Sequence, residues 1–500
     1  MVQSCTGTNM DEESGKSEIS THTVGPPVKV YSPRDWPVPR KVLTFVVLFM
    51  LAFVSTYSSG AYSPSISGVQ KHLGGSMEVA QLGTSLFMFG ISFGSLIWGP
   101  LGQTIGRRPV FLIAYSALTA FNVGVCVAQN MATILVCRFF AGFCGAAAFS
   151  NLSASINDFT TVRERNPYNS FFRFATFSGP VLAALLGSVA VRDSDWRWNL
   201  RSLPISVFVA LVIYAITGAE TSPQAVAANA QRYEADRQAL DATLHEEKGM
   251  FQRFALVARN HLPSRASLRT LAQAFRYELS VPWILLFEEP VVMVACFYTS
   301  MLYGLLYGTL LFFPYVWTTL RDFDQVQTGY TYFAMLASFL LYTVVLGCRV
   351  QHVAFQRAFD KGEQYPELRI QVGSWSLLTV PIGLFIFAWT GPFEHVHWIG
   401  PIIGIFILSF GMMYVFSSWL AYLGDSYGNN AAAVIGINTF LRSLVAGAFP
   451  LFTHQMVTRM TFQGAMSMFG GVSIPLTVVG YVFCVYGPKL RARSKHAVHE

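Results

Sequence analysis

The stretch "WGPLGQTIGRRPVF", residues 98–111, places a short basic turn between two long apolar runs, 81–101 and 109–128. Glycines such as Gly99 and Gly106 permit a tight turn, while the adjacent Arg107 and Arg108 favour water over lipid. Each run has roughly the 17–25 residues that a helix needs to cross a bilayer. The stretch therefore predicts two membrane-spanning helices that are joined by a tight basic loop at one membrane surface.

The same alternation of apolar runs and polar loops continues along the whole chain. Of its 500 residues, 53% are hydrophobic and only 12% are charged, whereas a water-soluble chain usually carries about 25% charged residues. We therefore predict an all-α membrane protein whose twelve transmembrane helices form two six-helix bundles. The first six runs lie at 42–62, 81–101, 109–128, 131–153, 170–191 and 203–218. The second six lie at 290–316, 328–347, 372–391, 397–418, 430–453 and 466–487.

The polar segments divide the chain into five parts. Residues 1–41 are predicted to form a disordered cytosolic tail because they are polar and rich in proline. A first bundle (42–218), a charged cytosolic connector (219–282), a second bundle (283–487) and a C-terminal tail (488–500) follow. Most of the 34 lysines and arginines fall in the two tails, the connector and the loops on the same side. The positive-inside rule therefore places both termini in the cytosol.

Several classes of function are excluded by what the sequence lacks. The seven cysteines form no CxxC pair, and His395 and His397 have no further ligands beside them, so we expect no metal site. No nucleotide-binding or nucleophile motif occurs, so we expect no cofactor and no enzymatic activity. The net charge of +7 follows from the topology. We expect no nucleic-acid partner, because no basic run lies on a polar aromatic surface.

Three arginines fall inside apolar runs, where an arginine at the helix centre costs about 2.5–3.5 kcal/mol. Such residues usually face a cavity or a partner, which makes Arg138 and Arg442 candidate functional residues. Two interpretations of Arg173 stay open, because it lies near the start of its run: a functional role, or a side chain that reaches the membrane surface. Asn438 precedes Arg442 by four residues. The two side chains share a helix face, and we predict that they line a ligand site.

Tyr303 and Tyr307 lie one helical turn apart in the seventh run. A tyrosine offers an apolar face and a hydroxyl, which suits an amphipathic organic ligand, although a packing stripe would give the same spacing. The small residues of "AGFCGAAAFSNLSAS", 141–155, instead favour close packing of helices. The carboxylates at the ends of the runs do not identify a group that carries a proton; they are Asp158, Glu288, Glu289 and Asp425.

Several motifs, taken together, resemble those of the major facilitator superfamily, and specifically of its fungal twelve-segment drug:proton antiporter group. They are "GPLGQTIGRRP" (99–109), "RFFAGFCGA" (138–146) with "NDF" (157–159), and "SGPVLAALLGS" (178–188) with "DWRWNL" (195–200). The resemblance covers about residues 40–490. It implies the major facilitator fold and a monomer in the plasma membrane. It also implies proton-coupled export of small hydrophobic or amphipathic organic compounds, such as drugs or a fungal secondary metabolite, by alternating access.

The resemblance also implies roles for particular residues. It implies coupling or gating roles for the residues that match the motifs of the antiporter group: Gly99, Gly106, Arg107, Arg108, Arg138, Asp158, Gly179 and Pro180. Substrate contact is expected for Tyr303, Tyr307, Asn438 and Arg442. Two positions depart from the pattern. Gln103 stands where the group usually has an acid, so a latch on Arg107 or Arg108 is weaker or is held by another carboxylate. Ala183-Ala184 replaces a common Gly-Pro, which predicts a straighter helix.

Two other functions are compatible with the same sequence. One is an uptake symporter or a polyamine carrier of the same fold, although a polyamine site would need several carboxylates in the cavity. The other is a membrane receptor or scaffold that transports nothing, for which the departures at Gln103 and Ala183-Ala184 leave room.

Overall fold

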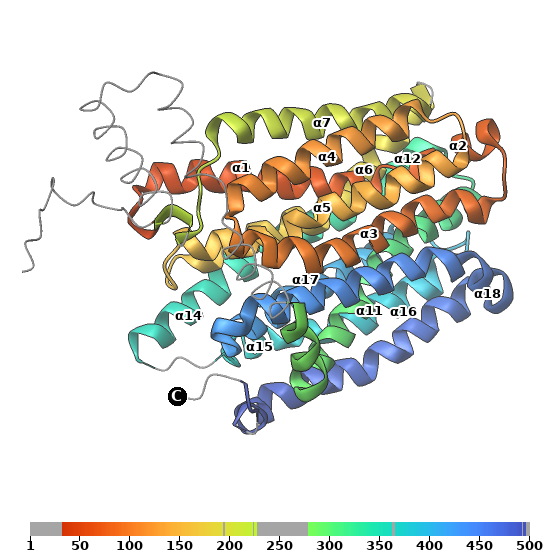
Figure 1. Ribbon diagram of the computed structural model, residues 1–500. Helices are drawn as coiled ribbons and strands as arrows, with labels where there is room; N and C mark the ends of the chain where they lie inside the picture. The colour runs from red at the N-terminus through yellow and green to blue at the C-terminus, as the bar shows by residue number, and fades with distance from the viewer. Residues whose placement is uncertain are drawn as a thin grey trace, which may run out of the picture.

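The computed structural model describes residues 33–193, 196–223, 225–227, 279–362, 366–492 and 494–496, and the regular elements in this part of the chain are helices. Figure 1 shows them lying along one long axis, with the first half of the chain above the second. Residues 1–32 of the predicted tail and 228–278 of the predicted connector lie outside the described residues.

The first half contains seven helices in the described part of the chain. They are α1 (Val38–Gly60), α2 (Ile66–Leu73), α3 (Met77–Thr104), α4 (Arg107–Val127), α5 (Met131–Phe159), α6 (Arg165–Asp193) and α7 (Trp196–Thr217). Side-chain caps set two of the starts: the Ser76 Oγ accepts from the Val79 amide at the start of α3, and the Asn130 Oδ1 accepts from the Thr133 amide at the start of α5.

The second half is less regular, with short helices and π-helical turns in series. A short helix, Leu279–Glu288, comes first. The labelled α-helices that follow are α11 (Pro290–Pro314), α12 (Gln325–Thr331), α13 (Phe333–Leu341), α14 (Gln351–Asp360), α15 (Leu368–Gln371), α16 (Thr379–Thr390), α17 (Ile399–Ser426) and α18 (Ala431–Arg491). Helix α18 contains a break at Thr461, where φ is 64°. It therefore supplies two membrane spans, as the runs at 430–453 and 466–487 predict.

The predicted all-α membrane architecture is confirmed. Within the described residues, eleven helices are long and apolar enough to cross a membrane, and a shorter apolar helix, Ser374–Thr390, supplies the twelfth span. The helices extend past the predicted apolar runs by several residues at many ends. For example, α5 continues to Phe159 rather than stopping at 153. Polar residues continue the helix there, whereas hydropathy marks only the part that fits the bilayer core.

The two ends of the molecule differ and need names. The terminal end holds the start of α1 and the last described residues, 494–496; the distal end is the opposite one, where α2 lies (Figure 1). The basic loop after α3 lies at the terminal end, because α3 begins beside α2 and runs the full length of the molecule. Each half therefore begins and ends at the terminal end.

Small residues let the helices of the first half approach closely, as predicted for 141–155. A Cβ atom added to Gly142 of α5 would lie 2.0 Å from the carbonyl oxygen of Phe87 on α3, and one added to Gly90 would lie 2.1 Å from that of Phe139. The same holds between α1 and α6. There, a Cβ atom on Gly179 would lie 2.0 Å from the Thr56 Oγ1. In both places backbones touch with no space for a side chain.

The two halves contact each other mainly through α3 with α18 and α6 with α12. The Ser92 hydroxyl donates to the carbonyl of Phe440 over 2.8 Å, which ties α3 to α18. A Cβ atom on Gly329 of α12 would lie 2.9 Å from the Ser188 Cβ of α6. Ala183 and Ala184, on the same α6 helix, are both buried, and α6 continues past them without a break.

Candidate functional site

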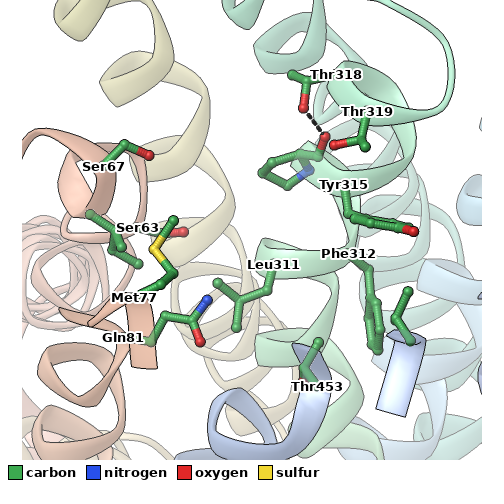
Figure 2. Close-up of a pocket in the computed structure, with 13 residues that line it drawn as sticks. Ser63, Ser67, Met77, Gln81, Leu311, Phe312, Tyr315, Thr318, Thr319 and Thr453 are labelled. Carbon is green, nitrogen blue, oxygen red and sulfur yellow. Dashed lines mark hydrogen bonds between the residues drawn. The ribbon is translucent and has the colours of Figure 1, made fainter. Parts of the chain in front are cut away.

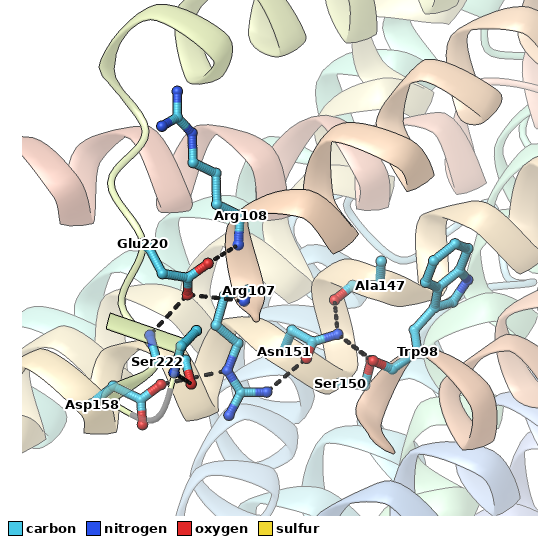
Figure 3. Close-up of polar contacts among 10 residues, drawn as sticks. Trp98, Arg107, Arg108, Ala147, Ser150, Asn151, Asp158, Glu220 and Ser222 are labelled. Carbon is cyan, nitrogen blue, oxygen red and sulfur yellow. Dashed lines mark hydrogen bonds and ion pairs between the residues drawn. The ribbon is translucent and has the colours of Figure 1, made fainter. Parts of the chain in front are cut away.

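The basic turn that opens the sequence is held by an acid from a distant part of the chain. Glu220, which follows α7, accepts hydrogen bonds from the backbone amides of Arg107 and Arg108 over 2.9 and 3.0 Å (Figure 3). These amides are at the start of α4, where unpaired N–H groups and the helix dipole attract an anion. Gly106 adopts φ +99°, and a Cβ there would lie 2.7 Å from the Glu220 Oε2. Glycine is therefore required at 106 for both reasons.

The two arginines of the turn have different partners. The Arg107 Nη1 donates to the Asn151 Oδ1 over 2.7 Å, and its Nε lies 3.4 Å from the Asp158 Oδ2 (Figure 3). Both partners are on α5, so Arg107 fastens α4 to α5. The Arg108 side chain donates instead to the carbonyl of Ala215 over 3.2 Å. The predicted Arg107 and Asp158 are thus brought together.

Gly99 and Gln103, on the last turns of α3, face the same neighbourhood. A Cβ on Gly99 would lie 3.6 Å from the Ser150 Cβ, which is ordinary contact. Gln103 lines a small cavity of about 30 Å³ that also touches Arg107 and the first residues of α18. Position 103 has no acid, but two other carboxylates bind Arg107: Asp158 pairs with its side chain, and Glu220 accepts from its backbone amide.

The substitution Gln103→Glu is therefore expected to change little. A new carboxylate at 103 would add one partly exposed charge beside an arginine that already has an acid, and such pairs contribute about 0–1 kcal/mol. We expect the transport rate to stay within about twofold of wild type, and the melting temperature to stay within a few degrees of it. The measurement is transport in cells and thermal unfolding of purified protein. A severalfold gain in transport would show that the wild-type latch lacks an acid.

Buried polar contacts close the terminal end between the halves. The Arg369 Nε donates to the Asp425 Oδ2 over 2.8 Å, and its Nη1 donates to the Asn166 Oδ1 of α6 over 2.9 Å. The Asn166 amide donates in turn to the carbonyl of Gly347 over 3.1 Å. One buried asparagine of the first half is therefore clamped by two segments of the second.

A second inter-half contact lies deeper in the molecule. The Arg173 Nη1 of α6 donates to the Ser417 hydroxyl of α17 over 2.8 Å, and Arg173 is buried. The structure thus favours an inter-half contact for Arg173 over a side chain that reaches the membrane surface. On the outside of the same end, Arg163 pairs with Asp360 of α14. Both of those side chains are more than half exposed, so this pair adds little.

Another ion pair ties α1 to the loop between α5 and α6. The Lys41 Nζ lies 3.0 Å from the Glu164 Oε2. The hydrogen bond from the Lys41 ammonium lowers the pKa of the Glu164 carboxyl below its ordinary value. Because the Glu164 side chain is nearly half exposed, solvent screens most of the attraction. The pair therefore contributes little to the stability of the fold.

At the distal end the halves separate around two adjoining cavities of about 260 and 480 Å³. Figure 2 shows the smaller one, with Ser63, Ser67 and Met77 on one side and Phe312 and Tyr315 on the other. The two cavities share Ser63 and Ser67. Among the described residues that line them, Lys71 alone carries a charge. The molecule is therefore closed at one end and hollowed at the other.

Arg138 lies between the helices of the first half and is fully satisfied. Its guanidinium donates to the carbonyls of Gly83, Ser58 and Ser59 over 3.1, 2.8 and 3.2 Å. The side chain is fully buried and also lies over the Phe87 ring, at 4.4 Å from the centroid. Arg138 thus joins α5 to the last turn of α1 and to α3, and it does not line either distal cavity.

The other predicted ligand residues gather halfway along the molecule. Tyr303 and Tyr307 of α11 are fully buried, with ring centroids 5.3 Å apart, and the Tyr307 hydroxyl is 2.6 Å from the Ser59 hydroxyl of α1. The Arg442 guanidinium lies 4.8 Å from the centroid of the Tyr303 ring. Asn438 turns to another part of α11, where its Nδ2 donates to the Thr299 Oγ1 over 2.7 Å. The structure therefore brings Arg442 and both tyrosines together.

Gly179 and Pro180 mark the place where α6 meets the end of α1. A Cβ on Gly60 would lie 2.4 Å from the carbonyl oxygen of Pro180. Gly60 closes α1, directly after the two carbonyls that Arg138 binds. The two motif residues of α6 and the arginine of α5 thus support the same point of α1 from different sides.

The sequence did not predict three residues as part of the site: Glu220, Asn166 and Arg369. Glu220 was assigned only to the connector, although an acid just after the last span of the first half is a signal for a helix-end contact. Asn166 and Arg369 lie in the first turn of α6 and in the short helix α15, in sequence segments between the apolar runs that hold many similar polar residues, and nothing local singles them out.

The hydrogen bond between Ser59 of α1 and Tyr307 of α11 joins the two halves near the middle of the molecule. The substitution Tyr307→Phe removes it and leaves the ring. A neutral hydrogen bond contributes about 0.5–1.5 kcal/mol, so we expect the population in which α1 and α11 part at this contact to rise severalfold. Thiol labelling of a cysteine at position 453, which lines the smaller cavity but is buried, measures this, in a chain without other cysteines and with Phe339→Leu as a control for altered packing. Equal labelling of Tyr307→Phe and its parent would contradict the expectation.

Two helical halves around a central contact, closed at one end and hollowed at the other, form a multi-pass membrane protein with the architecture that many transporters share. The sequence model of the Major Facilitator Superfamily matches residues 48–450, and the chain belongs to this superfamily.

Similar proteins support the same assignment. The chain is 33% identical over 464 residues to the efflux pump FUBT of Fusarium oxysporum, and the aligned region covers 92% of this chain and 75% of FUBT. It is 32% identical over 468 residues to the major facilitator superfamily multidrug transporter mdrA of Aspergillus fumigatus, with 93% and 74% covered. Among solved structures, the proton:xylose symporter XylE matches with a TM-score of 0.61 at 14% identity, over 90% of this chain and 97% of that one. That likeness concerns the fold.

Proposed function

We propose that the chain exports hydrophobic or amphipathic organic compounds from the cytosol across the plasma membrane, in exchange for protons and by alternating access. The observation that carries the proposal is the asymmetry of the two ends. The halves are clamped at the terminal end through Asn166 and Arg369, whereas cavities of about 260 and 480 Å³ separate them at the distal end. The names of the similar fungal proteins, an efflux pump and a multidrug transporter, favour export of organic compounds.

In this proposal the terminal end faces the cytosol. The described residues that adjoin the predicted tails and connector lie at that end, as does the Arg107 turn. These sequence segments together hold most of the lysines and arginines. The described state then has its cavities open toward the outside. Export continues when the contacts of Asn166 and Arg173 break and the halves rock about the middle of the membrane.

Proton exchange would provide sufficient energy. One proton that moves through ~100 mV contributes about 2.3 kcal/mol, and a pH difference of ~1 unit adds about 1.4 kcal/mol. Together they sustain a gradient of roughly several hundredfold for one neutral molecule per proton.

The lining of the cavities argues against a polyamine carrier. A polyamine site needs carboxylates, but the charged group among the described lining residues is the ammonium of Lys71. The arginines that lie deeper, Arg138 and Arg442, are cationic as well.

The test of export is the efflux of labelled hydrophobic compounds from cells that express the chain, with and without a protonophore. We expect faster efflux than in cells without the chain, and we expect the protonophore to abolish the difference. Efflux that persists in the protonophore would refute proton exchange, and accumulation in place of efflux would refute export.

The orientation has its own test. Ser67 is exposed at the distal end. In a chain whose native cysteines are replaced, a cysteine at 67 should react with a membrane-impermeant maleimide on intact cells. A cysteine in place of Arg357, which is exposed on α14 at the terminal end, should react only after the cells are permeabilised. The reverse pattern would overturn the orientation.

A further inference from the structure

The Arg442 guanidinium lies in the interior without a hydrogen-bond acceptor. Only 3% of the residue is exposed, and its Nε and Nη1 atoms have no hydrogen-bond partner in the described part of the chain. The two other arginines inside apolar runs differ. Arg138 donates to three carbonyls, and Arg173 donates to Ser417. Arg442 alone of these three has no hydrogen-bond acceptor in the described part of the chain.

A buried cation without an acceptor is costly, because hydrogen bonds and an opposite charge normally offset its lost hydration. Aromatic faces offset part of this cost. The Arg442 guanidinium lies 4.7 Å from the centroid of the Phe416 ring, 4.8 Å from that of Tyr303 and 5.4 Å from that of Phe149. These rings leave the N–H donors free, and an anion would satisfy them.

Aromatic rings from distant parts of the chain surround Arg442. The rings come from both halves of the transporter, Phe149 from α5 and Tyr303 and Phe416 from α11 and α17. One helical turn from Arg442, the Asn438 Oδ1 is buried and has no partner among the described residues either. A ligand that carries an anionic group and an aromatic body would use the guanidinium and the rings together.

Side chains of α11 mark a path from this place toward the distal cavities, which we call the route. Tyr303, Tyr307 and Leu311 follow at one-turn intervals, and Leu311 lines the smaller cavity. Ser59 lies in the last turn of α1, and the cavity residue Ser63 follows four residues later, just after the end of that helix. The Ser59–Tyr307 hydrogen bond therefore lies between Arg442 and the cavities. The Lys71 ammonium at the larger cavity gives the outer part of the route the same sign of charge.

We propose that the transported compounds are amphipathic organic anions, with a carboxylate or sulfonate bound to Arg442 and an apolar ring between Tyr303, Phe416 and Phe149. This inference rests on the proposed export function and names its substrate class. The guanidinium offers the planar pair of donors that a carboxylate accepts.

The test compares two probes of the same shape that differ in charge. Purified full-length protein in phosphatidylcholine nanodiscs is titrated with 2-naphthoate and with neutral 2-naphthamide, and binding is followed by thermal shift and by equilibrium dialysis of the radiolabelled probe. We expect the anion to bind at least about tenfold more tightly than the amide, since hydrogen bonds to a charged group exceed neutral ones by that much or more. Equal binding of the two probes would overturn the proposal.

Variants locate the binding to Arg442. We expect Arg442→Gln to lose the preference for 2-naphthoate, and Arg442→Lys, which keeps the charge but not the planar fork, to retain part of it. Arg201→Gln is the matched control, because it removes an exposed arginine at the distal end and the same net charge. A preference that survives in folded Arg442→Gln, or that falls equally in Arg201→Gln, would refute the site. If Arg442→Gln does not fold, Arg442→Lys provides the test. A full wild-type preference for 2-naphthoate in Arg442→Lys would refute the proposal that the planar donor pair of the Arg442 guanidinium binds the anion.

Two further arms distinguish a transported anion from a bound lipid and separate the site from the export function. Adding phosphatidylglycerol to the nanodiscs should leave naphthoate binding unchanged; competition by this lipid would show that Arg442 binds a headgroup, and would overturn the substrate assignment. Efflux of both probes from cells forms the second arm. Export of the amide alone would leave the exporter proposal standing and refute the anion class. Binding of naphthoate without any efflux would retain the anion site and refute export.

Discussion

Replacing Arg138 with alanine will reduce transport by more than about tenfold, and it will lower the melting temperature as well. The guanidinium donates to the carbonyls of Gly83, Ser58 and Ser59, and all of these groups are buried. The Ser58 and Ser59 carbonyls lie at the end of α1 and would be left without a donor, at a cost of about 1–3 kcal/mol each, whereas the Gly83 carbonyl lies inside α3 and keeps its helical partner. The lost hydrogen bonds belong to the last turn of α1, which also holds the Ser59 hydroxyl that contacts Tyr307. Transport suffers because α1 then no longer holds the central contact in place.

The conservative variant makes the prediction sharper. Arg138→Lys keeps the charge but replaces a planar fork with a single ammonium, which cannot serve three carbonyls in the same directions. We therefore expect it to recover only part of the stability and little transport. The measurements are transport in cells at matched surface expression and thermal unfolding of purified protein, with the exposed Arg201→Gln as control. Wild-type transport by a well-expressed Arg138→Ala would remove this arginine from the mechanism.

Replacing Glu220 with alanine will have the second largest effect. Its carboxylate binds the amides of Arg107 and Arg108, and also that of Ser222 over 2.9 Å. Hydrogen bonds to a charged group contribute about 1.5–3 kcal/mol, and an anion at a helix start adds about 0.3–1 kcal/mol. Without them the chain after α7 loses its attachment to the Arg107 turn. We expect a fall in transport of roughly tenfold.

The position of the acid, rather than its charge alone, is what this prediction tests. Glu220→Gln keeps one accepting oxygen and should fall between Glu220→Ala and wild type. Adding Gln103→Glu to Glu220→Ala restores a carboxylate near Arg107, but on α3 and not beside the two amides. The double variant should therefore remain as impaired as Glu220→Ala. Recovery of transport in the double variant would show that either acid can serve the turn.

The predicted spans illustrate what hydropathy determines. Apolar runs placed the twelve helices in the right order, and even the break within α18 separated two predicted runs. Boundaries were less certain where polar residues continue a helix, as in α5 beyond 153. The motif residues Arg107 and Asp158 were predicted as site residues and do meet. The acid that compensates for Gln103 was expected only in general terms, and its identity as Glu220 depends on contacts between residues more than a hundred positions apart.

The sequence by itself determined the class of protein, the number of spans and the rarity of charges inside them, because burial in lipid constrains composition locally. It also singled out Arg138 and Arg442, and by the same argument for both. Only the tertiary structure distinguished them: carbonyls at the end of α1 saturate Arg138, whereas aromatic rings surround Arg442 and leave its donors free. Which acceptors reach a buried cation depends on how distant helices pack, and local sequence does not encode that packing.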